Sequence, residues 1–214
     1  DDKVEYLRAY ANTYVREEIL QEQIIRNLAP FQRFLQAAAQ MDTKILNFAN
    51  IARDTGTTIP TVQSYYQILE DTLLGFSLPA FNESIRKRQK SSPKFYFFDS
   101  GVARACADLL SYEVDSSYRG LLFETLIINQ IKSYNDYSGK NLGVYYYGPS
   151  GGSEIDLVIE TKKRSQNQKP HLIAIEIKSG VKFKNEWIQS LKTLNFPEKI
   201  EVEKKYCVYQ GELL

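Results

Sequence analysis

The hydrophobic pattern changes its period near Ser116, and this change restricts the fold more than any other feature of the chain. Before Ser116, apolar residues recur at spacings of three or four positions with polar residues between them, as in amphipathic helices. Beyond it, a helix is predicted over 118–134 and a shorter one over 185–194. Strand-like composition marks the runs 143–147, 154–160, 171–178 and 203–209. We therefore expect an α+β chain that ends in a mixed sheet of about four strands.

The part before Ser116 is predicted to contain a helix-turn-helix. The first forty residues have helical spacing throughout. A following helix over 46–55 ends at Gly56, and the next begins near Thr58 with Pro60 in its first turn. A glycine after one helix and a proline at the start of the next are typical of two helices joined by a tight turn.

Two apolar and aromatic runs follow this pair of helices. They cover residues 73–81 and 94–99 and flank a polar segment, as the two strands of a hairpin do. Together with the helix-turn-helix they predict a winged helix. We expect this winged helix to lie in a first domain of residues 1–105, and the sheet to lie in a second domain of residues 106–214.

Composition excludes several classes of protein. The chain has 27 Lys and Arg against 26 Asp and Glu, so no overall positive field draws it to nucleic acid or to a membrane, and any such site must be a local patch. No apolar run approaches the roughly 18 to 20 residues needed to cross a bilayer. The two cysteines are far apart and there is one histidine, which supports neither a disulfide framework nor a zinc site. We expect a soluble, cytoplasmic protein without a membrane partner.

The residues most suggestive of chemistry are Asp156, Glu176 and Lys178, on two neighbouring predicted strands. Glu176 and Lys178 are two positions apart on one strand and therefore share a face, and hairpin pairing brings Asp156 beside them. Two close carboxylates suit Mg²⁺ or Mn²⁺, and Mg²⁺ is the usual partner of phosphodiester chemistry. Lys178 would neutralise charge in the transition state, or take a proton from water if burial lowers its pKa.

A third acid interrupts an apolar stretch of the predicted helix over 118–134. Glu124 stands between Phe123 and Thr125, where an unpaired carboxylate is costly. We expect it to complete the site if that helix packs across the two strands. The alternative for all these charges is an ordinary half-exposed sheet face, on which Glu176 and Lys178 form an ion pair of little energetic consequence.

Basic residues gather around these candidates. Residues 161–205 carry eleven Lys and Arg against five Asp and Glu, and we expect part of this excess to surround the metal site and to contact nucleic acid. No Lys or Arg lies between Gly56 and Leu74, so the helix-turn-helix is as consistent with protein packing as with DNA binding. The expected nucleic-acid contacts are Arg86, Lys87, Arg88, Lys162, Lys163, Arg164, Lys182 and Lys184.

The order of these groups resembles the PD-(D/E)XK nuclease superfamily, which has the restriction-endonuclease-like fold. A Glu on a helix is followed by Glu-Ile-Asp on a strand and then by Ile-Glu-Ile-Lys-Ser-Gly. The resemblance implies that Asp156 and Glu176 hold the metal and that Lys178 is the motif lysine. Ile155 stands where the motif has proline, and the Gln-x-x-x-Tyr element of one branch is reduced to Gln189 followed by Thr193.

The chain as a whole is similar to the C-terminal half of predicted AAA+ ATPases of bacteria and archaea. This resemblance implies an ATPase domain upstream, and the single methionine, Met41, with Asp1 as first residue, fits a processed form or an excised piece. No G-x-x-x-x-G-K-[ST] occurs, so ATP is expected to bind only through the missing domain. The stretches that carry the resemblance are 6–19, 66–72, 93–101, 120–124 and 154–158.

Two functional hypotheses follow from the sequence. In the first, a nuclease-like domain in a fragment of an AAA+ protein binds or cleaves nucleic acid with Mg²⁺ or Mn²⁺. In the second, the same domain is a non-catalytic module that binds DNA or protein and serves assembly of the ATPase. The sequence leaves the oligomeric state open, a homo-oligomer included.

Overall fold

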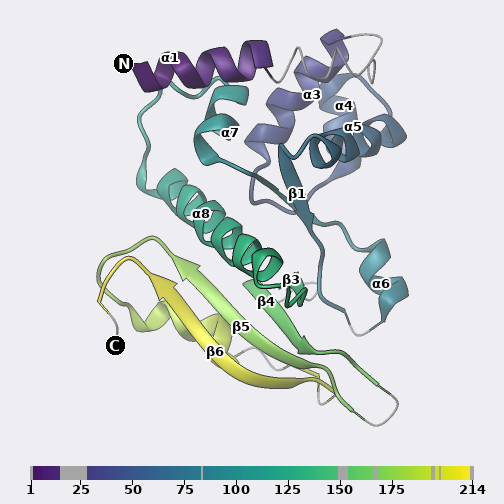
Figure 1. The fold of residues 1–214 in the computed structure, drawn as a ribbon, viewed down its shortest axis with the longest axis vertical. Coiled ribbons are helices and arrows are strands. Elements are labelled where there is room, and N and C mark those ends of the chain that lie inside the picture. The colour runs from purple at the N-terminus through teal and green to yellow at the C-terminus, as the bar shows by residue number, and fades with distance from the viewer. Residues whose placement is uncertain are drawn as a thin grey trace. The chain divides into compact units, whose positions relative to one another are not determined.

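The computed structural model describes residues 2–14, 28–82, 84–148, 154–165, 168–193, 196–197 and 199–212. The fold is α+β and divides into two compact units (Figure 1). The first unit consists of residues 1–77 and 94–115, and the second of residues 78–93 and 116–214. A single boundary after residue 105 was expected, whereas each unit is built from two separate stretches of the chain.

The first unit is mainly helical. The helical spacing expected for the first forty residues is met on both sides of 15–27, and Ile25, one of the residues with that spacing, lies outside the described residues. A short strand of this unit, β1 (Gly75–Leu78), pairs with β2 (Lys94–Phe97). The helices are α1 (Asp2–Ala9), the π-helical turn η1 (Tyr10–Tyr14), α3 (Leu28–Gln40), α4 (Phe48–Thr55), α5 (Ile59–Asp71) and α7 (Ser100–Cys106).

The predicted turn between α4 and α5 is confirmed, and its ends are capped by local chemistry. The Asn47 side chain accepts a hydrogen bond from the backbone N–H of Asn50, and the Thr58 hydroxyl accepts one from Thr61. Gly56 ends α4 in the left-handed region at φ 68°, which side chains with a Cβ rarely adopt. The two helices pack on a core that includes Phe34, Leu69 and Phe95.

The segment between β1 and β2 is not the simple hairpin loop that the sequence predicted. It contains the helix α6 (Ile85–Lys90), and residues 78–93 belong to the second unit. There, the N–H of Phe81 donates to the carbonyl of Tyr146 at 2.7 Å, and the N–H of Tyr146 donates to Pro79 at 3.1 Å. The segment therefore extends the sheet of the second unit by a short edge pairing, a contact that no local pattern could indicate.

The second unit is a helix followed by a four-stranded mixed sheet, as predicted. Its long helix is α8 (Ser116–Tyr137), and the short helices η2 (Asn185–Ile188) and α9 (Gln189–Thr193) precede the last strand. The first three strands run antiparallel, and the fourth is parallel to the third (Figure 1). In sheet order these strands are β3 (Gly143–Tyr147), β4 (Ile155–Lys162), β5 (His171–Lys178) and β6 (Glu201–Tyr209).

One face of this sheet is covered by α9. Leu191 of α9 packs in a buried cluster with Val158 of β4 and with Leu172 and Ala174 of β5. These strand residues alternate with others that point to the opposite face, as the period of a strand requires. Across the described residues, no helix combines the length and the apolar character needed to cross a membrane.

Candidate functional site

The pairing of β4 with β5 brings the candidate acids together. Leu157 pairs with Ile175 and Val158 with Ala174, so one step further along the same antiparallel register Asp156 lies opposite Glu176. Directly opposed residues in such a pair have their side chains on the same face. The two carboxylates therefore meet at the end of the face that α9 covers.

The ammonium of Lys178 lies between these two carboxylates. Its Nζ is 2.6 Å from Oε1 of Glu176 and 3.7 Å from Oδ2 of Asp156. Glu176 is almost fully buried, with a side chain 6% exposed, whereas the Lys178 side chain is 32% exposed. Lys178 thus lies within ion-pair distance of both predicted acids, and of the three side chains it is the most exposed to solvent.

The two acids differ in how their oxygens are used. Asp156 is held in place because its Oδ2 accepts a hydrogen bond of 2.7 Å from the backbone N–H of Ile177. Glu176 Oε2 is buried and has no hydrogen-bond partner among the described residues. A buried carboxylate oxygen without a partner is costly, and in native proteins it often marks a functional position or an ion.

Burial and charge shift the protonation equilibria of this group. Burial raises the pKa of the Glu176 carboxyl, and the charge of Asp156 raises it further, against the opposing effects of the Lys178 ammonium and of a hydrogen bond from the Ser190 side chain. Burial by itself lowers the pKa of Lys178, but the neighbouring carboxylates outweigh it and the pKa lies above its ordinary value. Lys178 is therefore an ammonium at neutral pH, which favours charge neutralisation over removal of a proton from water.

Glu124 lies near this centre but is not part of the carboxylate pair. It is half-buried on α8, one helical turn after Gly120, and Gly120 faces the Ser179 hydroxyl at the end of β5. Its charge helps to raise the pKa of Lys178. The expected third acid therefore acts on the lysine.

Three neighbours of the site were missed by the sequence reasoning. They are the Ile177 backbone N–H, Ser190 on α9 and Cys207, which pairs with Glu176 in the parallel register of β6. Burial raises the pKa of the Cys207 thiol, and the charges of Glu176 and Asp156 act in the same direction. Cys207 pairs with Glu176, which is distant in sequence, so its place beside the site could not be predicted from local patterns. The alternation of β6 could have indicated only the face of the sheet on which it lies.

The donor set fits a hard divalent cation. Within the part of the chain that the structure describes, no group of three or more His, Cys, Asp and Glu side chains is arranged to hold a metal. Mg²⁺, however, is commonly bound through one or two carboxylates, with water and substrate phosphate supplying the other ligands. The paired oxygens of Asp156 and Glu176, one of them a buried Glu176 oxygen without a partner, match that chemistry.

The basic residues expected around the metal site fall into two groups, which corrects the expectation of one surrounding rim. Lys182 and Lys184 are exposed and follow β5 directly after the site. The other group lies where β4 ends, six residues beyond Asp156, which is about 20 Å at the rise of an extended strand. We call it the distal basic group; its exposed members are Lys162, Lys163 and Arg164.

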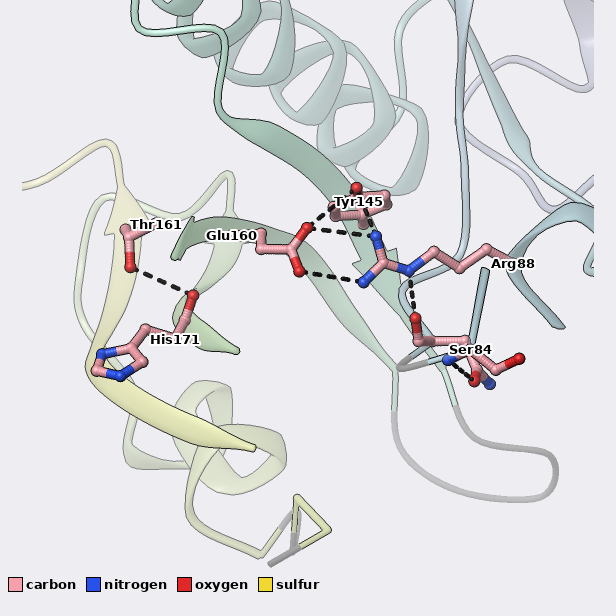
Figure 2. Close-up of polar contacts among 7 residues, drawn as sticks. Ser84, Arg88, Tyr145, Glu160, Thr161 and His171 are labelled. Atoms are coloured by element: carbon pink, nitrogen blue, oxygen red, sulfur yellow. Dashed lines mark hydrogen bonds and ion pairs between the residues drawn. The ribbon is translucent and has the colours of Figure 1, made fainter. Parts of the chain in front are cut away.

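Contrary to expectation, the guanidinium of Arg88 is not exposed for contact with nucleic acid but is bound within the second unit. Its guanidinium makes two hydrogen bonds to the carboxylate of Glu160, at 3.2 and 3.3 Å, and a third of 2.7 Å to the Tyr145 hydroxyl (Figure 2). The guanidinium also stacks 4.6 Å from the ring centroids of Phe81 and Tyr145. Side chains of Arg88 and Glu160 are 17% and 3% exposed, so this pair anchors α6 to the sheet.

This anchor leaves the other predicted contacts of α6 at the surface. Arg86 and Lys87 are exposed on α6, close along the chain to the anchored Arg88. Because Glu160 immediately precedes Thr161 and the distal basic group, the anchor brings α6 to the same end of β4. Through Arg88, the segment that carries Arg86 and Lys87 is thus held at the end of β4 where Lys162 lies.

His171 has a structural environment. Its Nδ1 lies 2.7 Å from Oε1 of Glu203, and the Thr161 hydroxyl donates to its backbone carbonyl at 3.2 Å (Figure 2). The hydrogen bond to His171 lowers the pKa of the exposed Glu203 carboxyl. Among the described residues, this ring is paired with the carboxylates of β6, so it serves the pairing of β5 with β6.

Comparison with known proteins adds two family matches and two relatives. Residues 1–113 match a domain of unknown function (DUF8612), and residues 119–213 match a second domain of unknown function (DUF4143). An uncharacterized protein of Mycobacterium bovis and one of Mycobacterium tuberculosis are each 23% identical over 167 residues. These matches cover 77% of the chain but 37% of each relative, so the chain spans little more than a third of their length. No solved structure matches. Since the DUF8612 match covers more than half of the chain, the chain belongs to the DUF8612 family.

Proposed function

We propose that the second unit cleaves phosphodiester bonds of nucleic acid with the help of Mg²⁺ or Mn²⁺. The observation that carries this proposal is the meeting of Asp156 and Glu176 at one ammonium, with one buried glutamate oxygen left unpartnered. Most buried carboxylate oxygens in native proteins are hydrogen-bonded, because an unsatisfied one costs stability. The Glu176 oxygen without a hydrogen-bond partner therefore favours a site that binds a further ligand.

The roles of the residues follow from their environments. Asp156 and Glu176 would hold the metal, and the bound metal would polarise the phosphoryl group and activate water. The backbone N–H of Ile177 fixes the orientation of Asp156. Lys178, kept as an ammonium, would stabilise the negative charge that develops on the phosphate oxygens. Glu124 would keep the lysine charged and oriented.

The order of elements supports the same proposal. A helix, three antiparallel strands, a short helix and a fourth strand parallel to the third follow one another in the second unit. The resemblance to PD-(D/E)XK nucleases implies a Glu on a helix followed by the two acids on neighbouring strands, and this order is consistent with it. Fold and positions support a nuclease assignment, while function must be tested at the site itself.

The wider context that we propose is an AAA+ ATP-binding protein. DUF4143 domains are commonly found with AAA ATPase domains. ATP would bind only to that further domain, and α4, α5 and the β1–β2 pair would act as a winged helix. Because α5 carries no Lys or Arg, we assign its exposed face to protein contacts in the assembly.

Nucleic acid would be held by the second unit. This unit carries eighteen Lys and Arg against twelve Asp and Glu, whereas the first carries nine against fourteen. The proposed contacts are those at the two ends of the β4–β5 hairpin, without Arg88, whose guanidinium is committed to Glu160. They are Arg86, Lys87, Lys162, Lys163, Arg164, Lys182 and Lys184.

Cleavage assays with matched variants test the proposal. Linear DNA, supercoiled DNA and RNA are each incubated with the chain, with Mn²⁺ and with EDTA. We expect Mn²⁺-dependent cleavage that Asp156→Asn and Glu176→Gln abolish. Asp136→Asn is the control, since it makes the same change on an exposed carboxylate paired with Lys132 on α8. Cleavage that survives both site variants, or never occurs, contradicts the proposal.

The alternative is a non-catalytic module that binds DNA or protein. It is favoured by one observation, namely that Lys178 already neutralises much of the charge of the two acids. Binding without cleavage, with an affinity that falls steeply as salt rises, would identify a nucleic-acid-binding module. Binding that is insensitive to salt and absent for nucleic acid would point to a protein partner.

A further inference from the structure

We infer that Lys178 occupies the position between Asp156 and Glu176 that a divalent cation would take, so that metal binding is an exchange in which the ammonium leaves. This inference rests on the proposed function, because it concerns the same two carboxylates. It adds a regulatory property to the site: below a threshold of free metal, the lysine closes the site internally.

The distances support competition for the same oxygens. Lys178 Nζ is in direct contact with Oε1 of Glu176 and also reaches Oδ2 of Asp156. A Mg²⁺ shared by the two carboxylates needs oxygen ligands at about 2.0–2.1 Å, and the Lys178 ammonium lies between the same two carboxylates. The positive charges also repel each other strongly, because Glu176 is almost fully buried and solvent screens the site poorly.

The burial pattern shows which group would move. Glu176 and Asp156 are held on paired strands, with side chains 6% and 13% exposed. Lys178 has a flexible four-carbon stem and a side chain that is 32% exposed, so its ammonium can swing outward without unpairing a strand. The carboxylates would thus stay in place while the lysine exchanges.

Glu176 also offers a starting point for the exchange. Oε1 is bound to the lysine, whereas Oε2 of the same carboxylate has no hydrogen-bond partner among the described residues. Glu176 Oε2 could therefore accept a cation before the Lys178 ammonium leaves Oε1. Glu124, whose charge already acts on Lys178, would receive the displaced ammonium.

Mn²⁺ affinity tests the exchange without any measurement of cleavage. Isothermal titration calorimetry is performed on the wild type, Lys178→Met and Lys140→Met. We expect Lys178→Met to bind Mn²⁺ about tenfold more tightly, since the competing charge has been removed. Lys140→Met removes an equal charge from an exposed position beyond the end of α8 and should leave the affinity within about twofold of the wild type.

Two further variants exclude an indirect effect. Lys178→Gln removes the charge but keeps a polar side chain, so it should also tighten binding if it folds as the wild type does. Adding Glu176→Gln to Lys178→Met should abolish the gain, because the gain requires the freed carboxylate. Thermal unfolding confirms that each variant is folded.

The outcomes separate this inference from the proposed function. If the wild type binds Mn²⁺ and Lys178→Met binds no more tightly, the exchange is overturned while the metal site stands. If neither protein binds Mn²⁺, the metal site is refuted, and both the proposed function and the exchange fail with it.

Discussion

The guanidinium of Arg88 binds the carboxylate of Glu160 through both of its terminal nitrogens, across 72 residues of sequence. Both side chains are largely buried, and the Tyr145 hydroxyl completes the network (Figure 2). A buried ion pair adds little by itself, but removing one partner leaves the other charge uncompensated. Together with the backbone pairing of Phe81 with Tyr146, this long-range relationship attaches residues 78–93 to the sheet.

Arg88→Met should therefore destabilise the second unit by about 3–5 kcal/mol. Urea unfolding followed by the fluorescence of Trp187, the single tryptophan, reports on this unit alone. The double variant with Glu160→Gln should recover most of the loss, because no buried charge remains. Arg53→Met is the control: its pair with Asp54 is 74% and 61% exposed, so the change should stay within about 1 kcal/mol. If Arg88→Met and Arg53→Met lowered the free energy of unfolding equally, the Arg88–Glu160 pair would not anchor the segment.

The buried tyrosines Tyr66 and Tyr146 provide a matched comparison. The Tyr66 hydroxyl has no hydrogen-bond partner among the described residues, whereas that of Tyr146 donates to the Ser92 carbonyl at 2.7 Å. Tyr66→Phe should leave stability unchanged or slightly raised, and Tyr146→Phe should cost about 1 kcal/mol. Circular dichroism follows the helical first unit and Trp187 the second. A clear loss for Tyr66→Phe would show that its hydroxyl is satisfied.

The same tyrosine predicts a pH dependence. Burial, and secondarily the charge of Asp42, raise the pKa of Tyr66 well above its ordinary value of 10.0. Above pH 10 the unfolded chain releases this proton while the folded chain keeps it, so the wild type loses stability as pH rises. Tyr66→Phe lacks this loss, and its advantage over the wild type should grow above pH 10. Parallel pH profiles would contradict the assignment.

The sequence was sufficient where the decisive contacts are local or alternate regularly. The strands of the sheet, the ends of α4 and α5, and the shared face of Glu176 and Lys178 all depend on periods of two or 3.6 residues or on capping. Asp156 was placed correctly because a hairpin joins its strand to the next. Such features require no knowledge of distant partners.

One of the remaining features depends on a contact between distant residues. The sequence predicts an exposed wing at α6 because Arg88 lies among other basic residues. Only its pairing with Glu160 shows that Arg88 is buried. The spread of the basic residues was mispredicted for a different, local reason. Lys162 ends the strand that carries Asp156 near its start, so Lys162 cannot surround that acid.

The separation of the basic residues predicts how nucleic-acid length affects binding. Replacing Lys162, Lys163 and Arg164 by alanine should reduce the slope of log affinity against log salt by about 0.9 for each phosphate that is no longer neutralised. Because this group lies about 20 Å from Asp156, the effect should vanish for duplexes shorter than about six base pairs. Lys140→Ala should have no effect at any length. A loss of affinity that is independent of length would place the group beside the site.

Lys178 should affect metal affinity and cleavage in opposite directions. Lys178→Met frees the carboxylates and should bind Mn²⁺ more tightly, yet it lacks the ammonium that would stabilise charge on the phosphate oxygens. We expect single-turnover cleavage to be slower by about a hundredfold at saturating Mn²⁺, and further Mn²⁺ should not restore it. Lys140→Met should cleave at the wild-type rate. Cleavage by Lys178→Met at the wild-type rate would show that the lysine only occupies the site, with no part in the reaction.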